Sequence, residues 1–360
     1  MNRYDYTGKT IYMGIDVHKK TYSCVSICEG EVIKRDRMPA KAEILLNYIH
    51  NFFNGAVVKT AYEAGFSGFH LHRFLLSHGI ENQVVHPGAI EVASRDRVKT
   101  DKRDALKIAT QLSSHRLKGI FVPSVEQEAR RSVTRLRQQI WRSRQRIGNQ
   151  LKGVLFTQGL IDVNDDTRIS SRWIIKKINE LSKLQAHEDL SYSVQRYAEE
   201  WNDLTRRLKM IEGQLQNQAK QDGLTMIYQS APGIGLLHAR ELANELGDMS
   251  QFKNEKKLFS FIGLTPSEYS SGEHVRQGNI SRQGRSVLRK IFIEAAWVAI
   301  RQDPSLNEIY DRLSARRGKK RAIVAVARHL AGRIRACIKM GCLYEKREAI
   351  KDQVKQQQFA

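Results

Sequence analysis

Cysteine and proline are scarce in this sequence, with 4 cysteines and 6 prolines among 360 residues. The cysteines form two distant pairs whose spacings do not match the usual two-residue gap of a zinc knuckle. We therefore expect reduced, buried thiols at all four positions, Cys24, Cys28, Cys337 and Cys342. His70 and His72 in an HLH motif have no cysteine pair near them, so we expect an ordinary structural role for both.

Long apolar runs are also missing. The most apolar stretches, such as residues 287–300, are interrupted by charge and fall short of the ~20 residues that span a bilayer. The opening residues, MNRYDYTGKT, have no apolar signal-peptide core. We expect no membrane association and a place in the cytoplasm.

Acidic residues are outnumbered. Lysine and arginine total 60 against 38 for aspartate and glutamate, which gives a formal net charge of +22. Such an excess of positive charge calls for a polyanionic partner. Without a membrane anchor, nucleic acid is the partner that we expect.

The first third of the chain alternates strand and helix patterns. Short β-branched and aliphatic runs bounded by turn residues predict strands, and apolar residues at helical spacing predict helices. We expect strands at 10–17, 21–27, 32–38, 57–64 and 82–87, and helices at 41–53, 67–78 and 100–117. This order indicates an α/β domain, a mixed sheet flanked by helices, over residues 1–122.

Strand signals are almost absent between residues 125 and 220. The pattern predicts two long paired helices, a coiled-coil spacer or oligomerisation region over residues 123–222. Phosphate contact and plain solvation both remain open for the arginines of its first half, at positions 130, 131, 135, 137, 142, 144 and 146.

The last section, 223–345, is predicted to be mainly helical and is followed by a polar tail at 346–360. It opens on a helix, a glycine turn and a second helix, with Ala239 and Leu242 facing inward, which resembles a helix-hairpin-helix. Backbone amides at Gly233 and Gly235 could bind a DNA phosphate, although an ordinary helical turn would look the same. By composition, residues 263–286 are a flexible basic loop, followed by apolar helices at 286–301 and 320–340.

Four acids carry the chemistry of the N-terminal section. Asp16 and Glu63 each end an apolar strand, where an unpaired buried carboxylate would be unfavourable. Asp101 and Asp104 share one face at the start of a helix, where they could simply cap it and complement its dipole.

Together the four acids have the layout of the ribonuclease-H-like nuclease fold, in which strand ends and a helix converge on divalent ions. Oxygen-only ligands select Mg²⁺ or Mn²⁺, which can assist attack on a phosphodiester. The neighbouring Lys99, Lys102 and Arg103 could hold substrate phosphates.

The segments MGIDVHKKTYSCVSI, AYEAG and RVKTDKRDALKIA resemble the N-terminal DEDD (RuvC-like) domain of the IS110/IS1111 family of transposases, which is related to the Piv-type DNA invertases. The C-terminal GLTPSEYSSGE and RQGNISRQGRSVLR are similar to the transposase module of that family. The resemblance implies that Ser271, with Ser270 as the nearby alternative, attacks DNA to form a phosphoserine link. Charge and position suggest phosphate neutralisation by Arg276, Arg282, Arg285 and Arg289.

The resemblance further implies a bacterial protein of the cytosol or nucleoid that excises and inserts an element under guidance from a bridge RNA. It also implies homo-oligomers, dimers or tetramers, in which the acid domain of one subunit meets the serine domain of another. Two alternatives remain open: a Holliday-junction resolvase or other structure-specific nuclease of the same fold that needs no Ser271, and a non-catalytic DNA-binding regulator.

Overall fold

The computed structural model describes residues 5–90, 101–162, 164, 167–183, 187–271, 274–281 and 283–348, without the side chains of 101, 102, 269–271 and 274–277. By its internal contacts the chain divides into two units, Met1–Val122 and Pro123–Ala360. Within the described residues, no helix combines the length and apolar character needed to cross a bilayer.

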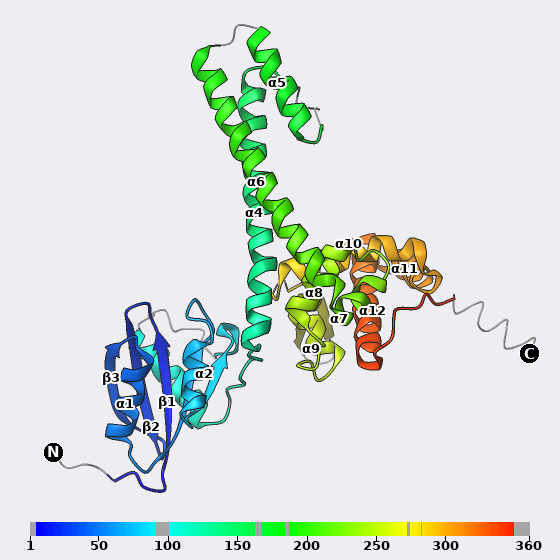
Figure 1. Cartoon of the computed structure of the whole chain (residues 1–360). Helices are drawn as coiled ribbons and strands as arrows, with labels where there is room; N and C mark the ends of the chain where they lie inside the picture. The colour runs from blue at the N-terminus through cyan, green and yellow to red at the C-terminus, as the bar shows by residue number, and fades with distance from the viewer. Residues whose placement is uncertain are drawn as a thin grey trace, which may run out of the picture. The chain divides into compact units, whose positions relative to one another are not determined.

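The first unit is built on a five-stranded mixed sheet (Figure 1). The strand order is β3-β2-β1-β4-β5, in which β1 pairs antiparallel with β2 and parallel with β4. All five strands lie where the sequence patterns predicted them. Their bounds are Thr10–Val17 (β1), Thr21–Cys28 (β2), Glu31–Pro39 (β3), Val57–Glu63 (β4) and Glu81–Val85 (β5).

Helices cover both faces of this sheet. Side chains of α1 (Ala42–Phe52) and α2 (His70–Ser77) pack with Ile11, Met13 and Ile15 of β1 in one core. On the opposite face α3 (Asp101–Ser113) packs against β1, β2 and β4. Successive residues of a strand point to opposite faces, so the even-numbered residues of β1 face α3. A short 3₁₀ turn, η1 (Pro87–Ala89), follows β5.

Two helices of 33 residues each dominate the start of the second unit. α4 (Val125–Thr157) and α6 (Glu188–Lys220) lie side by side, as predicted (Figure 1). The sequence did not predict a third helix, α5 (Ser171–Lys183), which packs at one end of the pair. Trp173 and Ile174 of α5 join Leu151, Leu155 and Trp201 in a small core.

The remaining part of the second unit is mainly helical around one large core. Phe292, Ala295 and Ala296 of α10 are fully buried in it, as are Ala239 and Leu242, the two residues predicted to face inward. Its elements are α7 (Gly223–Ser230), α8 (Leu236–Leu246), α9 (Glu255–Ile262), β6 (Pro266–Ser271), β7 (His274–Ile280), α10 (Ser286–Gln302), α11 (Pro304–Arg317) and α12 (Lys319–Met340).

Two sequence predictions were wrong. Residues 263–286, predicted as a flexible loop, contain the antiparallel hairpin β6–β7. Polar, glycine-containing strands lack the alternating apolar pattern by which a strand is recognised. Cys342 is exposed, whereas the other three cysteines are buried as predicted.

Candidate active site

Asp16 and Glu63 end two neighbouring parallel strands. Ile15 of β1 lies in register with Tyr62 of β4, so the two acids that follow are the next pair along these strands. Ala61, on the same face of β4 as Glu63, packs with residues of α3, whereas Tyr62 packs in the core of the opposite face. Both carboxylates therefore project from the same sheet end toward the α3 side.

The direction of α3 brings its first turn to that same sheet end. His115, just after the C-terminal end of α3, stacks edge-on against Tyr12 near the start of β1, with ring centroids 5.8 Å apart. Gly14 lies farther along β1 and faces Ala105 and Ala109, nearer the start of α3. The helix thus runs opposite to β1. Asp104, in its first turn, lies toward the strand end that carries Asp16.

Gly14 makes this close approach possible. A Cβ atom built on Gly14 would lie 2.2 Å from the carbonyl oxygen of Ala105 and 2.4 Å from the amide nitrogen of Ala109. Any side chain at this position would collide with the helix backbone. The glycine therefore sets the distance between the acids on the sheet and those on the helix.

Asp16 and Asp104 each have a basic side chain next to the carboxylate. Nε2 of His18 lies 2.9 Å from Oδ2 of Asp16, and Nζ of Lys107 lies 3.6 Å from Oδ1 of Asp104. His18 escaped notice in the sequence, although a histidine two residues beyond a strand-end acid falls on the same face of an extended chain.

Some predicted residues fall outside what the structure describes. Lys99 lies outside the described residues. The backbone of Asp101 and Lys102 belongs to α3, but their side chains are not described. Arg103 is exposed on α3. Among the side chains that are described, no three histidine, cysteine or acidic residues already lie close enough to hold one metal ion. Three elements nevertheless place carboxylates toward this sheet end, and carboxylate oxygens are ligands that suit an oxygen-preferring divalent cation.

Ser271 is the last residue of β6, at the closed end of the β6–β7 hairpin. It lies opposite His274 in the strand register, and Ser270 lies opposite Val275. The structure does not describe the side chains of these four residues or of Arg276. Arg282 lies outside the described residues. Ser271 thus belongs to the second unit and the four acids belong to the first.

The predicted glycine turn lies between α7 and α8. Gly233 has a φ of +79°, and a Cβ there would lie 2.7 Å from Cα of Ala295 on α10, so packing alone accounts for this glycine. Gly235 is the N-cap of α8, with no side-chain cap, and a Cβ at this position would have no neighbouring atom within 4 Å. Of the two glycines, Gly235 is the one next to open space.

Two family models match the chain. Residues 13–157 match a model described as a transposase, the DEDD domain of IS110, which spans all four acids. Residues 226–311 match the model of the transposase IS116/IS110/IS902 family, which spans the glycine turn and Ser271. The two models cover the N-terminal and C-terminal sections separately.

Two insertion-sequence transposases and one further protein are similar to the chain over most of their own length. The transposase for insertion sequence element IS1111A of Coxiella burnetii is 28% identical over 88% of this chain and 86% of its own. The transposase for IS1533 of Leptospira borgpetersenii is 26% identical over 80% of this chain and 85% of its own. Protein y4qE of Sinorhizobium fredii is 26% identical over 89% of this chain and 86% of its own.

The chain belongs to the IS110/IS1111 family of transposases. It is therefore a DNA strand-transfer enzyme, and its DEDD domain implies an active site that uses a metal. The predicted family and enzyme class are confirmed.

In this transposase the base of the serine hairpin is clamped to α9. Gly263, the left-handed C-cap of α9, and Gly284 allow the backbones on either side of the hairpin to meet, because a Cβ on either would lie 2.5 Å or less from a carbonyl oxygen. The amide of Arg285 donates to the carbonyl of Phe261 (3.0 Å), and Nη1 of Arg289 donates to the carbonyl of Gly263 (3.3 Å). Arg289 therefore already has a structural role.

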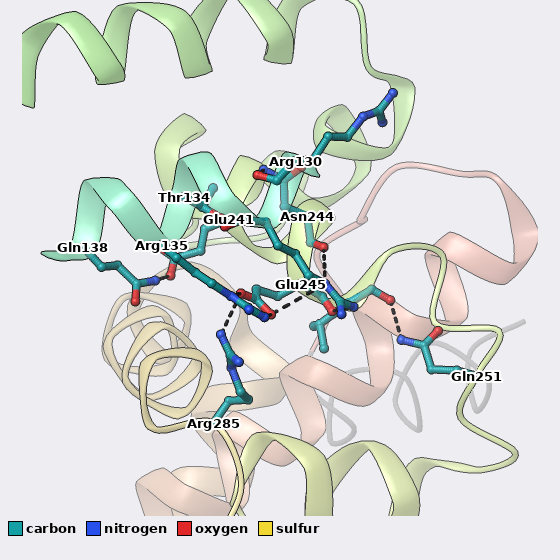
Figure 2. A network of polar contacts seen from close by, with 11 residues as sticks. Arg130, Thr134, Arg135, Gln138, Glu241, Asn244, Glu245, Gln251 and Arg285 are labelled. Carbon is teal, nitrogen blue, oxygen red and sulfur yellow. Dashed lines mark hydrogen bonds and ion pairs between the residues drawn. The ribbon is translucent and has the colours of Figure 1, made fainter. Parts of the chain in front are cut away.

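Arg285 likewise has a partner inside the protein. Its Nη2 lies 2.6 Å from Oε1 of Glu245 on α8, whose side chain is only 2% exposed. From α4, Nε of Arg135 donates to the same oxygen (2.9 Å), and Arg131 donates to the carbonyls of Asn244 and Glu245 (Figure 2). This Glu245 cluster joins α4, α8 and the start of α10.

The Glu245 cluster answers the question left open for several α4 arginines. Arg131 and Arg135 neutralise a buried carboxylate, and Arg137 pairs with Glu212 of α6 at 2.6 Å. The neighbouring Glu241, which accepts from Gln138, is also buried, and burial raises its pKa to about 7. Sequence periodicity could not reveal these pairs, because each joins residues far apart in the chain.

Proposed function

We propose that this transposase excises and inserts its element through serine-linked strand exchange, with Asp16, Glu63, Asp101 and Asp104 as the metal-binding acids and Ser271 as the nucleophile. The observation that supports the role of the acids is the placement of Asp16, Glu63 and the first turn of α3 toward one sheet end. The role of Ser271 rests on the resemblance of the serine segment to the family module.

Carboxylates from three elements favour Mg²⁺ or Mn²⁺ over softer metals. Such an ion, when bound, neutralises negative charge on a phosphodiester and lowers the pKa of an oxygen that it binds. Asp16 and Glu63 would hold it from the sheet, and Asp101 and Asp104 from the helix. Lys99, Lys102 and Arg103 would neutralise the substrate phosphates beside them.

In the proposed step, Oγ of Ser271 forms a bond to phosphorus while the bond from phosphorus to a DNA sugar oxygen breaks. The serine proton passes to solvent or a nearby base, and the departing oxygen takes up a proton to become a hydroxyl. Attack by the hydroxyl of another strand then displaces the serine, so the number of phosphodiesters is conserved.

DNA phosphates would be held by the backbone at the Gly233–Gly235 turn and by arginines near the hairpin. Because Arg285 and Arg289 already have protein partners, Arg276 and Arg282 carry most of this proposal. A bridge RNA would choose the target, and homo-oligomers, either dimers or tetramers, would join the acids of one subunit to the serine of another.

Ser271→Ala and Asp16→Asn test the proposed chemistry. We expect each to lower strand exchange by at least about a thousandfold, as removal of a nucleophile or of a central catalytic acid does elsewhere, while DNA affinity stays unchanged. Strand exchange is measured on a labelled donor–target pair, and covalent protein–DNA species are resolved on a denaturing gel. Ser270→Ala is the matched control and should retain both activities.

The outcomes separate the alternatives. Continued DNA cleavage by Ser271→Ala, with no covalent species in the unmodified protein, would identify a resolvase-type nuclease that uses only the acids. Loss of the covalent species in Ser270→Ala alone would move the nucleophile by one residue. Unchanged function in Asp16→Asn would point instead to a regulator without catalysis.

A further inference from the structure

Positive charge is distributed unevenly over the second unit. Three arginines of α4, Arg131, Arg135 and Arg137, are neutralised by buried or half-buried carboxylates, as described above. By contrast, five exposed cations lie within six residues where α11 ends and α12 begins. Among the described residues, no carboxylate lies within ion-pair distance of this basic cluster, Arg316, Arg317, Lys319, Lys320 and Arg321.

The α12 half of the basic cluster is unfavourable for the fold by itself, whereas Arg316 and Arg317 lie in the last turn of α11, where the helix dipole favours positive charge. Lys319, Lys320 and Arg321 form the first turn of α12, where the helix dipole favours negative charge, and this turn contains no acidic residue. The N-cap Gly318 provides no side-chain cap. Adjacent like charges also repel one another. Helix stability therefore does not account for Lys319, Lys320 and Arg321, and a bound polyanion would relieve both penalties.

A cleft of about 760 Å³ lies beside the basic cluster. Its apolar lining comes from Leu264, Ile280, Leu313 and Val324, while Gly278 and Asn279 of β7 contribute polar backbone. The cationic side chains that line it are Arg317, Lys320, Arg321 and Arg328. A lining that combines apolar and cationic side chains suits a sugar–phosphate strand, whose phosphates are charged and whose sugars and bases are less polar.

The cleft adjoins the open end of the hairpin that carries Ser271. Pro266, at the start of β6, lines it, and Ser271 lies five residues farther along the same strand. At ~3.3 Å per strand residue this separation is about 17 Å, or about five nucleotide steps of a DNA strand. A strand bound in the cleft could therefore extend to the serine.

We propose that the basic cluster and this cleft form a binding site for the DNA strand that is handed to Ser271. The proposal rests on the proposed function of Ser271 and adds the surface that holds its substrate. Arg317, Lys320 and Arg321 contact phosphates, and the apolar lining receives a sugar or base. The family model of the C-terminal section ends at residue 311, so the cluster lies outside the matched segment.

The triple variant Arg317→Ala, Lys320→Ala, Arg321→Ala tests this site in the full chain. We use the Ser271→Ala background, in which no covalent product can form, and a fluorescein-labelled DNA duplex of mixed sequence, about 20 base pairs long. Three lost phosphate contacts should weaken binding by roughly ten- to a hundredfold and reduce the slope of log affinity against log salt by about 2 to 3. Fluorescence anisotropy at several salt concentrations measures both.

A matched control removes the same charge elsewhere. Arg206, Arg207 and Lys209 are exposed on α6, and their triple alanine variant should bind DNA within about threefold of the parent. The single change Lys320→Glu reverses one exposed charge with little risk to folding and should weaken binding in the same direction. Equal losses in the α6 control, or unchanged affinity in the cluster variant, would overturn the proposal.

Competition with an RNA duplex of the same sequence distinguishes the two nucleic acids. Loss of RNA affinity with DNA affinity intact would overturn the assignment to DNA. The DNA site and the role of Ser271 are tested by different results. If the unmodified protein forms no covalent adduct with DNA, Ser271 is not the nucleophile, yet weaker DNA binding by the cluster variant would still support the DNA site. Normal DNA binding by the cluster variant rejects the site even if the adduct forms.

Discussion

Buried charge is the main energetic feature at the scale of single residues. Glu245 is 2% exposed in its side chain and contacts Arg135 and Arg285, so its negative charge is matched by partners rather than by water. Removing Glu245 would leave Arg131 and Arg285, both largely buried, without their carboxylate, and a buried pair that loses one partner typically lowers stability by ~3–5 kcal/mol. Glu241, one helical turn away on α8, lacks an arginine at ion-pair distance among the described residues, and its pKa rises accordingly.

The raised pKa of Glu241 predicts a pH-dependent stability. Because its pKa in the folded protein, about 7, exceeds the ordinary value of 4.5, folding favours the protonated form. The stabilisation is complete below about pH 4.5 and is lost as the pH rises through 7. A shift of this size corresponds to roughly 3 kcal/mol.

Urea unfolding between pH 5 and 8 measures this effect. Glu241→Gln should remove the component that falls with rising pH, so the difference in unfolding free energy between variant and parent should change across this range. Glu126→Gln, which alters an exposed ion pair with Arg130, should leave the pH dependence as it is. A parallel pH profile for Glu241→Gln and the parent would refute the assignment.

At the scale of elements, two contacts between backbones position the candidate site. α3 lies directly against β1 at Gly14, and the serine hairpin is clamped to the end of α9 through Gly263 and Gly284. In both places the absence of a side chain fixes the distance between two elements. Predicted catalytic residues lie on β1, on α3 and on the serine hairpin. Backbone contacts of this kind cannot be relieved by a change of rotamer.

Gly14→Val should separate α3 from β1. The new side chain would collide with the backbone of Ala105 and Ala109, which we expect to destabilise the first unit by about 1–3 kcal/mol. The same displacement should move Asp104 away from Asp16 and lower strand exchange more than DNA affinity. Thermal unfolding and the donor–target assay measure the two effects.

Gly153→Ala on α4 is the control for Gly14→Val. No atom lies within 4 Å of a Cβ at Gly153, and alanine favours a helix over glycine by roughly 0.5–1 kcal/mol. It should be neutral or slightly stabilising. Full activity in Gly14→Val would show that the spacing of α3 and β1 does not control the acids.

At the scale of the whole molecule, the predicted catalytic groups are divided between two units. The acids belong to residues up to Val122, and Ser271 belongs to the unit that starts at Pro123. A site shared between subunits would bring them together without any need for one chain to fold back on itself.

Mixing inactive chains tests a shared site. Asp16→Asn and Ser271→Ala chains are co-expressed with different tags, and mixed oligomers are purified. If acids and serine come from different subunits, a mixed dimer keeps one intact site of two, and strand exchange should recover to about half of the unmodified level. Each variant alone should stay inactive. No recovery in the mixed oligomer would place acids and serine in the same chain.

The sequence alone determined the strands and helices of the first unit, the paired long helices and the positions of the four acids. These depend on local periodicity and on strand ends, which a short stretch of chain already specifies. The motifs were also enough to identify the family, which the two family models confirm.

Tertiary structure decided what partners the charged residues have. No local pattern shows that Arg131, Arg135 and Arg285 meet one buried glutamate, because Glu245 lies 114, 110 and 40 residues away from them in the chain. Similarly, the polar strands of the serine hairpin are held by pairing with each other and by the clamp to α9, and not by an alternating apolar face. Charge composition gave the sum, +22, but only packing shows which cations are already neutralised and which remain exposed for a polyanion.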